Sequence, residues 1–138
     1  MTANPSHEFL AKIVADERLH LRWLATLSHL EQCGARKIAN YLPTENPSLD
    51  LLKHAAEEAR HAYFFKNLMH KLNPSPPQNL KLLCGPFGKR YLHLLDMQIC
   101  RLLRKDYGLR DRDLQKGSYL LTTYAIEKRA EEVYTIYE

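Results

Sequence analysis

Apolar residues recur at helical spacing along most of this chain. From His7 to Leu42 there is no proline and a single glycine, Gly34. The apolar side chains of this stretch fall on one helical face, as an amphipathic helix requires. Ser6 precedes the stretch as a candidate N-cap and Pro43 ends it. The pattern predicts one continuous helix whose buried positions are Leu10, Val14, Leu21, Leu24, Leu27, Ile38 and Tyr41.

Proline and glycine divide the remaining chain into three more helices. Asn46 followed by Pro47 is typical of a cap and first helical position, and the proline-rich segment 73–77 is a firm break. Gly108 stops the next amphipathic stretch. The predicted helices span 47–72, 89–107, and from Asp111 or Asp113 to 138. Long helices with short connections predict an all-α fold, a single antiparallel bundle over residues 1–138.

Composition excludes several other classes. The chain has 138 residues, of which 45% are hydrophobic and 26% charged, so disorder is disfavoured and one core is expected. Strand-type alternation is missing, no apolar run approaches the ~18 residues of a membrane span, and the N-terminus lacks a signal-peptide core. Cys33, Cys84 and Cys100 are odd in number and widely spaced, which favours a reducing, cytoplasmic location.

The net charge of +4 comes mostly from one basic patch. Such a patch could contact RNA, DNA or an anionic ligand. It lacks interleaved stacking aromatics, and acidic residues are nearly as numerous as basic ones, so a solvated helix face is favoured and nucleic-acid binding is disfavoured. The patch comprises Lys89, Arg90, Arg101, Arg104, Lys105, Arg110 and Arg112.

Three titratable residues fall on the predicted buried faces. Glu31 lies seven positions after Leu24 and seven before Ile38, and Glu58 and His61 interrupt the apolar face of the second helix. Burial of a carboxylate is unfavourable by roughly several kcal/mol unless the carboxylate is paired or bound to a metal. Glu-x-x-His projects from one helical face and can hold one ion. Carboxylates with an imidazole suit iron or manganese.

Other interpretations of these residues stay open. Glu-x-x-His is common on solvated helices, and Glu31 also fits a core carboxylate satisfied by hydrogen bonds. His54, one turn from Glu58, is expected to be a core or supporting histidine rather than a ligand.

A shift of 96 residues superimposes the first predicted helix on the last. Trp23 then meets Tyr119, Leu24 meets Leu120, and Thr26 meets Thr122. Glu31 falls on Glu127, and Gly34 falls on Ala130, where a small residue would let a neighbouring helix approach. We interpret this as an internal repeat. Chance similarity between two amphipathic helices is the alternative.

With these residues, the sequence resembles the ferritin-like superfamily of di-iron carboxylate proteins. In that family each of two helix pairs supplies one Glu and one Glu-x-x-His. The resemblance implies that Glu31, Glu58, His61 and Glu127 are metal ligands, with Glu31 and Glu127 bridging two ions. It implies an iron cofactor, with manganese possible, and Arg60 and Tyr124 as candidate supporting groups. Dioxygen would oxidise a small or lipid-like organic substrate at such a site.

The chain departs from the family pattern because the second Glu-x-x-His, expected near 154 and 157, lies past Glu138. The expected bundle is therefore incomplete, without its last ligand helix. A fragment truncated at its C-terminus, a homodimer that shares the site, and a scaffold without a site are the open explanations. A ferroxidase or iron-handling protein, and a metal-free helical interaction module that uses the basic patch, are the alternative functions.

Overall fold

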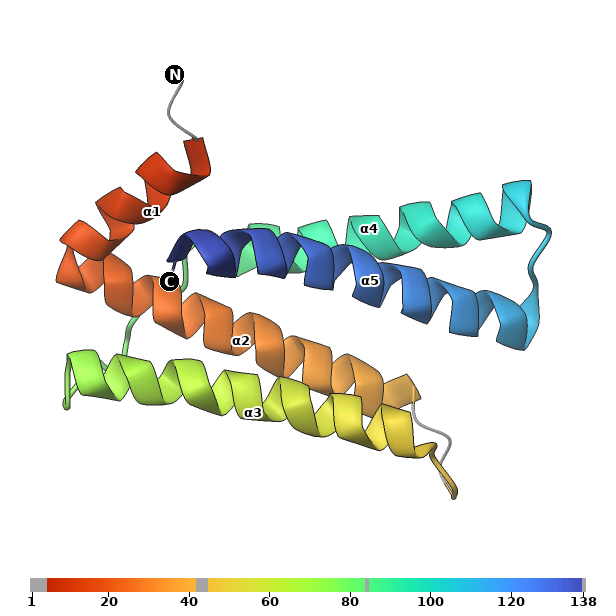
Figure 1. The fold of residues 1–138 in the computed structure, drawn as a ribbon, viewed down its shortest axis with the longest axis horizontal. Helices are drawn as coiled ribbons and strands as arrows, with labels where there is room; N and C mark the ends of the chain where they lie inside the picture. Colours follow the sequence, from red (N-terminus) through yellow and green to blue (C-terminus); the bar gives the residue numbers. More distant parts are fainter. Residues whose placement is uncertain (1–4, 42–44, 84, 138) are drawn as a thin grey trace. The chain divides into compact units, whose positions relative to one another are not determined.

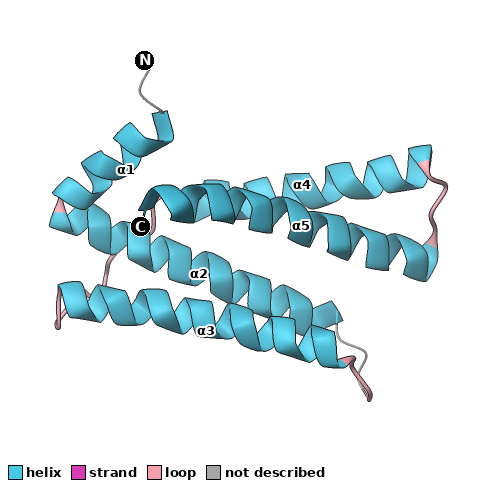
Figure 2. Cartoon of the chain, in the orientation of Figure 1, coloured by secondary structure: helices cyan, strands magenta, loops and turns pink. Residues whose placement is uncertain are grey.

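The structure, a computed structural model, describes residues 5–41, 45–83 and 85–137, and no strand occurs within these ranges (Figure 2). This confirms the all-α prediction. No helix in the described ranges is long and apolar enough to cross a membrane. Pro43 and Cys84 lie outside the described residues. The helices are α1 Pro5–Ala15, α2 Glu17–Tyr41, α3 Leu49–Leu72, α4 Gly85–Asp106 and α5 Asp111–Tyr137 (Figure 1).

The prediction of one uninterrupted helix over residues 7–42 is wrong, because the helix breaks at Asp16. The Asp16 carboxylate accepts a hydrogen bond from the Leu19 backbone N–H at 3.0 Å. This bond satisfies an N–H group that the first turn of a helix leaves without an intrahelical partner. Asp16 is therefore the N-cap of α2. Its side chain competes with helix continuation, as Asp side chains do near helix starts.

We expect Asp16→Ala to lower the free energy of unfolding by about 1 kcal/mol, the usual cost of losing an N-cap side chain. Asp16→Asn is the matched control, because asparagine caps helices about as well as aspartate. Urea unfolding followed by circular dichroism measures both. An equal loss in the two variants would show that the capping bond is not the cause.

The start of α3 is also shifted from its prediction. Ser48 rather than Asn46 is the N-cap, and its hydroxyl accepts from the Leu51 backbone N–H at 3.2 Å. Pro47 therefore precedes the cap instead of occupying the first helical position. The end of α3 at Leu72 is as predicted.

The chain divides into two compact units, each described by itself: Lys12–Gly85, and Met1–Ala11 with Pro86–Glu138. In the first unit α2 and α3 lie side by side and run antiparallel (Figure 1). The segment after α3 returns along α2. There the Arg22 Nε donates to the Lys81 carbonyl at 2.8 Å, and the Leu83 N–H donates to the Thr26 hydroxyl at 2.8 Å.

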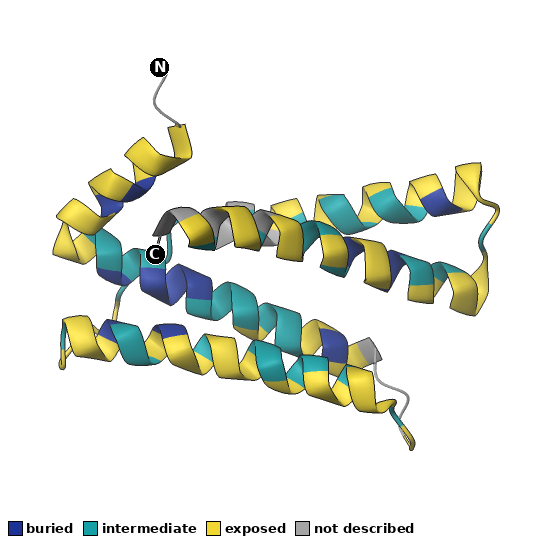
Figure 3. Ribbon diagram, viewed as in Figure 1, coloured by how far each residue is buried: buried dark blue, intermediate teal, exposed yellow. Residues whose placement is uncertain are grey.

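Burial along α2 confirms most of the predicted apolar face (Figure 3). Leu24 is 1% exposed, and Leu21, Leu27 and Ile38 on α2 are also buried, as is Leu10 on α1. Val14, by contrast, is 49% exposed. The break at Asp16 interrupts the helical periodicity that placed Val14 on the buried face.

Burial lowers the pKa of His20, which lies in the first turns of α2, below its ordinary value. As pH falls through the ordinary value of 6.5, the unfolded chain takes up the proton first. The free energy of unfolding should therefore decrease until the pH passes the lowered pKa of the folded state. His20→Gln should flatten this decrease, as urea unfolding between about pH 7.5 and 5 would show. An unchanged slope would contradict this prediction.

In the second unit α4 and α5 are joined by polar contacts. The Ser118 hydroxyl donates to Asp96 Oδ1 at 3.0 Å, and the Thr122 hydroxyl donates to the same oxygen at 3.4 Å. Ser118, Tyr119 and Thr122 are buried, whereas Leu120 is 55% exposed. Leu120, which the 96-residue repeat pairs with the buried Leu24, is therefore not on the packed side of α5. Hydroxyl groups that bond to Asp96 occupy the packed side instead.

Candidate metal centre

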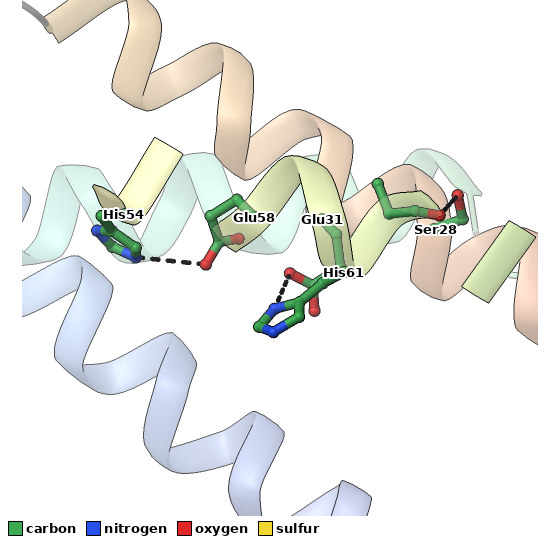
Figure 4. A network of polar contacts seen from close by, with 6 residues as sticks. Ser28, Glu31, His54, Glu58 and His61 are labelled. Atoms are coloured by element: carbon green, nitrogen blue, oxygen red, sulfur yellow. Dashed lines mark hydrogen bonds and ion pairs between the residues drawn. The ribbon is translucent and has the colours of Figure 1, made fainter. Parts of the chain in front are cut away.

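Glu31 on α2 meets Glu58 and His61 on α3. Glu58 and His61 are three residues apart and so share one face of their helix. His61 Nδ1 lies 3.6 Å from Glu31 Oε2. A dashed line marks this contact in Figure 4. One potential ligand atom from each of the three side chains lies within 4.8 Å of the others. The three first-pair ligands expected from the sequence are thus brought together.

A side-chain hydrogen bond sets the register of the two helices beside this cluster. The Ser28 hydroxyl on α2 donates to the Ala62 carbonyl on α3 at 2.7 Å (Figure 4). Ser28 lies three residues before Glu31, and Ala62 directly follows His61. The bond therefore places Glu31 opposite His61. Sequence reasoning missed Ser28, since mid-helix serines more often bond within their own helix.

Gly34 makes room for the Glu58 carboxylate. A Cβ atom at Gly34 would lie 2.7 Å from Glu58 Oε2, closer than real Cβ contacts allow. The prediction that a small residue three positions after Glu31 permits close approach is confirmed for Gly34. The absence of a side chain there lets the carboxylate lie against the α2 backbone.

His54 supports Glu58 from one turn away on α3. His54 Nε2 lies 3.3 Å from Glu58 Oε1, within hydrogen-bonding distance (Figure 4). Metal-binding carboxylates in proteins are themselves hydrogen-bonded, and such partners fix their orientation. His54 could also be a ligand, because its ring nitrogen lies within reach of an ion held by Glu58, so its supporting role stays a prediction.

The carboxylates of the cluster are largely withdrawn from solvent, while the imidazole is accessible. The side chains of Glu31 and Glu58 are 12% and 18% exposed, and that of His61 is 47% exposed. Two carboxylates in such an environment repel each other unless a cation or protonated histidine balances them. His61 is the most solvent-accessible of the three side chains.

The donor set fits a divalent first-row ion. With bonds of about 2.1 Å, two ligand atoms on one ion are at most about 4.2 Å apart. Three ligand atoms on one ion, however, lie about 3.0 to 3.6 Å from one another, so separations of up to 4.8 Å need a closure of roughly one ångström or more. Two carboxylates and one imidazole neutralise a divalent charge and suit iron or manganese. They leave coordination positions for further ligands.

Glu127, the fourth expected ligand, lies on α5 in the other compact unit and has an exposed side chain. Its role as a ligand stays a prediction. Arg60 and Tyr124, the expected supporting groups, also have exposed side chains, with Tyr124 60% exposed.

Comparison with known proteins identifies no relative: no family model, no curated protein and no solved structure matches this chain.

Gly34→Ala should lower the affinity for metal without lowering the free energy of unfolding. Alanine favours helix by about 1 kcal/mol over glycine, and the clashing atom is the mobile end of a glutamate, so the free energy of unfolding should stay the same or rise. The displaced Glu58 carboxylate should reduce Mn(II) affinity roughly tenfold, measured by titration calorimetry. Gly117→Ala on α5 is the control and should leave affinity unchanged. Wild-type affinity in Gly34→Ala would contradict the proposed position of Glu58.

Proposed function

We propose that Glu31, Glu58 and His61 bind one Fe(II) or Mn(II) ion, and that this chain is a ferritin-like non-haem di-iron, or Mn/Fe, carboxylate protein. The convergence of these three donors from two helices is the observation that supports it most directly. Gly34 and His54 add to it, because each accommodates or supports the Glu58 carboxylate that a metal would need.

A two-metal site needs a second set of donors. A homodimer would supply it, since the same three residues of a second copy provide another Glu and another Glu-x-x-His. Symmetric dimers are the commonest protein assemblies, and a twofold axis through the site would relate the two ions. Glu127 is proposed as an additional carboxylate ligand.

Two bound Fe(II) ions would supply the electrons for dioxygen reduction, and a small or lipid-like organic molecule is the proposed substrate. The residues of the chain hold and orient the ions. Glu31 and Glu58 provide negative charge in a largely water-excluded position, where electrostatic interactions are strong. His54 restrains the orientation of Glu58. His61, the most accessible donor, lies where ions and small molecules can enter.

An anaerobic Fe(II) titration tests this function, with bound ions counted per chain before oxygen is admitted. One ion per chain in a dimer, followed by oxygen consumption, is the expected result. Sedimentation equilibrium with and without Fe(II) shows whether the dimer is the species that binds. Absence of tight binding would contradict the proposal. Tight binding without oxygen consumption would reduce it to a metal site without oxidase activity.

A further inference from the structure

A basic pocket lies along the last turns of α4, in the second compact unit. Its volume is about 600 Å³, in the range of small-molecule sites. Four cationic side chains line it: Arg101, Arg104, Lys105 and Arg110. Asp96 and Met97 line its other end. These residues belong to none of the metal-centre elements, so an inference from them does not depend on the proposed function.

The helix and the loop after it bring the four cations together. Arg101, Arg104 and Lys105 are three and four positions apart and so share one face of α4. Gly108 adopts a positive φ of 64°, which reverses the chain at the helix end. The Leu109 N–H then donates to the Leu103 carbonyl at 3.2 Å. This closed turn places Arg110 back against the pocket.

The positive charge of the pocket is not balanced within the part of the chain that the structure describes. There, no ion pair involves any of the four cations. Asp96 is the one acidic residue among those lining the pocket, and its Oδ1 already accepts from Ser118 and Thr122. An excess of three positive charges therefore faces the cavity. Like charges held this close favour a multivalent anion.

The donor chemistry selects phosphate. Arginine presents planar forked donors that match phosphate oxygens, and three of the four cations are arginines. Asp96 lies nine residues, or about 13 Å, before Lys105 along α4. The negative charge of Asp96 directs the anionic group of a ligand toward the opposite end. Met97 offers a thioether surface to the uncharged remainder.

We propose that this pocket binds the phosphate or diphosphate group of a small organic ligand. A nucleic-acid strand fits less well, because single-strand sites add stacking aromatics to their cations and the residues lining this pocket include none.

Titration calorimetry with inorganic pyrophosphate, in NaCl of about 0.15 M to screen long-range attraction, tests the proposal. We expect one pyrophosphate per chain with a Kd below about 1 mM. Arg104→Gln and Arg110→Gln should each weaken binding at least about tenfold, since each removes a charged hydrogen-bond donor. Arg112→Gln is the matched control, because Arg112 is exposed near the pocket without lining it. Circular dichroism verifies the helicity of all variants.

Two further experiments test a lipid headgroup as the source of the phosphate and a nucleic acid as the alternative ligand. Vesicles of phosphatidylcholine with or without phosphatidic acid test a lipid headgroup, with pyrophosphate as competitor; competition by pyrophosphate supports the same pocket. Binding of a single-stranded RNA that Arg112→Gln weakens as much as Arg104→Gln would overturn the proposal in favour of a diffuse basic surface. Absence of pyrophosphate binding at about 1 mM would also overturn it.

Discussion

Glu58→Gln should lower the affinity of the chain for Fe(II) by more than about 100-fold. Loss of a partner that only orients a metal ligand already costs about 10- to 100-fold, and Glu58 is proposed as a ligand itself. Glutamine keeps the size of the side chain, so Gly34 still accommodates it, but the negative charge is lost. Anaerobic titration with a competing chelator measures the change in Kd.

The neighbouring residue provides the control for this substitution. Glu57 is adjacent on α3 and also half-buried, yet it does not belong to the three-residue cluster. Glu57→Gln should leave the Fe(II) affinity within about twofold of the wild type, a change of a few tenths of a kcal/mol. His61→Ala should reproduce the loss seen for Glu58→Gln. Equal effects of Glu57→Gln and Glu58→Gln would show that overall charge, rather than a built site, attracts the metal.

The positions of proline and glycine predict where most of the helices end, but they do not predict the break within the first long helical stretch. Proline and glycine mark the interruptions near residues 73–77 and 108, and the structure confirms both. Asp16 carries no such mark. An aspartate inside an amphipathic pattern is compatible with a solvated helix face, and only its bond to the Leu19 N–H reveals a cap. Val14 is exposed as a result, because its predicted burial depended on an unbroken helix.

The convergence of Glu31, Glu58 and His61 could be predicted because their spacing places each of them on the apolar face of its predicted helix. Spacing alone places Glu58 beside His61, and the antiparallel pairing of α2 and α3 adds Glu31. The register that aligns them depends on the Ser28–Ala62 bond. A hydrogen bond between a side chain and another helix's carbonyl leaves no periodic trace in a sequence.

Residues that the 96-residue repeat pairs do not always have the same burial. Thr26 and Thr122, which it pairs, are both buried, at 8% and 2% exposed. Leu24 and Leu120, which it also pairs, are 1% and 55% exposed. The packed side of α5 follows its hydroxyl bonds to Asp96 rather than its leucines. Glu127 was assigned through the same repeat, by its pairing with Glu31, so its prediction depends on a similarity that does not hold for Leu120.

Metal binding should raise the stability of the folded chain. At a free Mn(II) concentration of 100 times Kd, the free energy of unfolding should increase by about 2.7 kcal/mol, because the ion binds the folded site and not the unfolded chain. For a chain of this size the corresponding rise in Tm is roughly 10 °C. Thermal unfolding followed by circular dichroism, with and without Mn(II), measures it.

The size of this effect decides between two states of the cluster. Without metal, Glu31 has His61 and Glu58 has His54 as neighbours, at 3.6 and 3.3 Å. If these contacts alone satisfy the carboxylates, Mn(II) should leave Tm unchanged. If the carboxylates need an ion, Mn(II) should stabilise the wild type but not Glu58→Gln. Mg(II) is the matched ion, since it prefers oxygen ligands and loses water reluctantly. An equal rise in Tm with Mg(II) would contradict a site selected by His61.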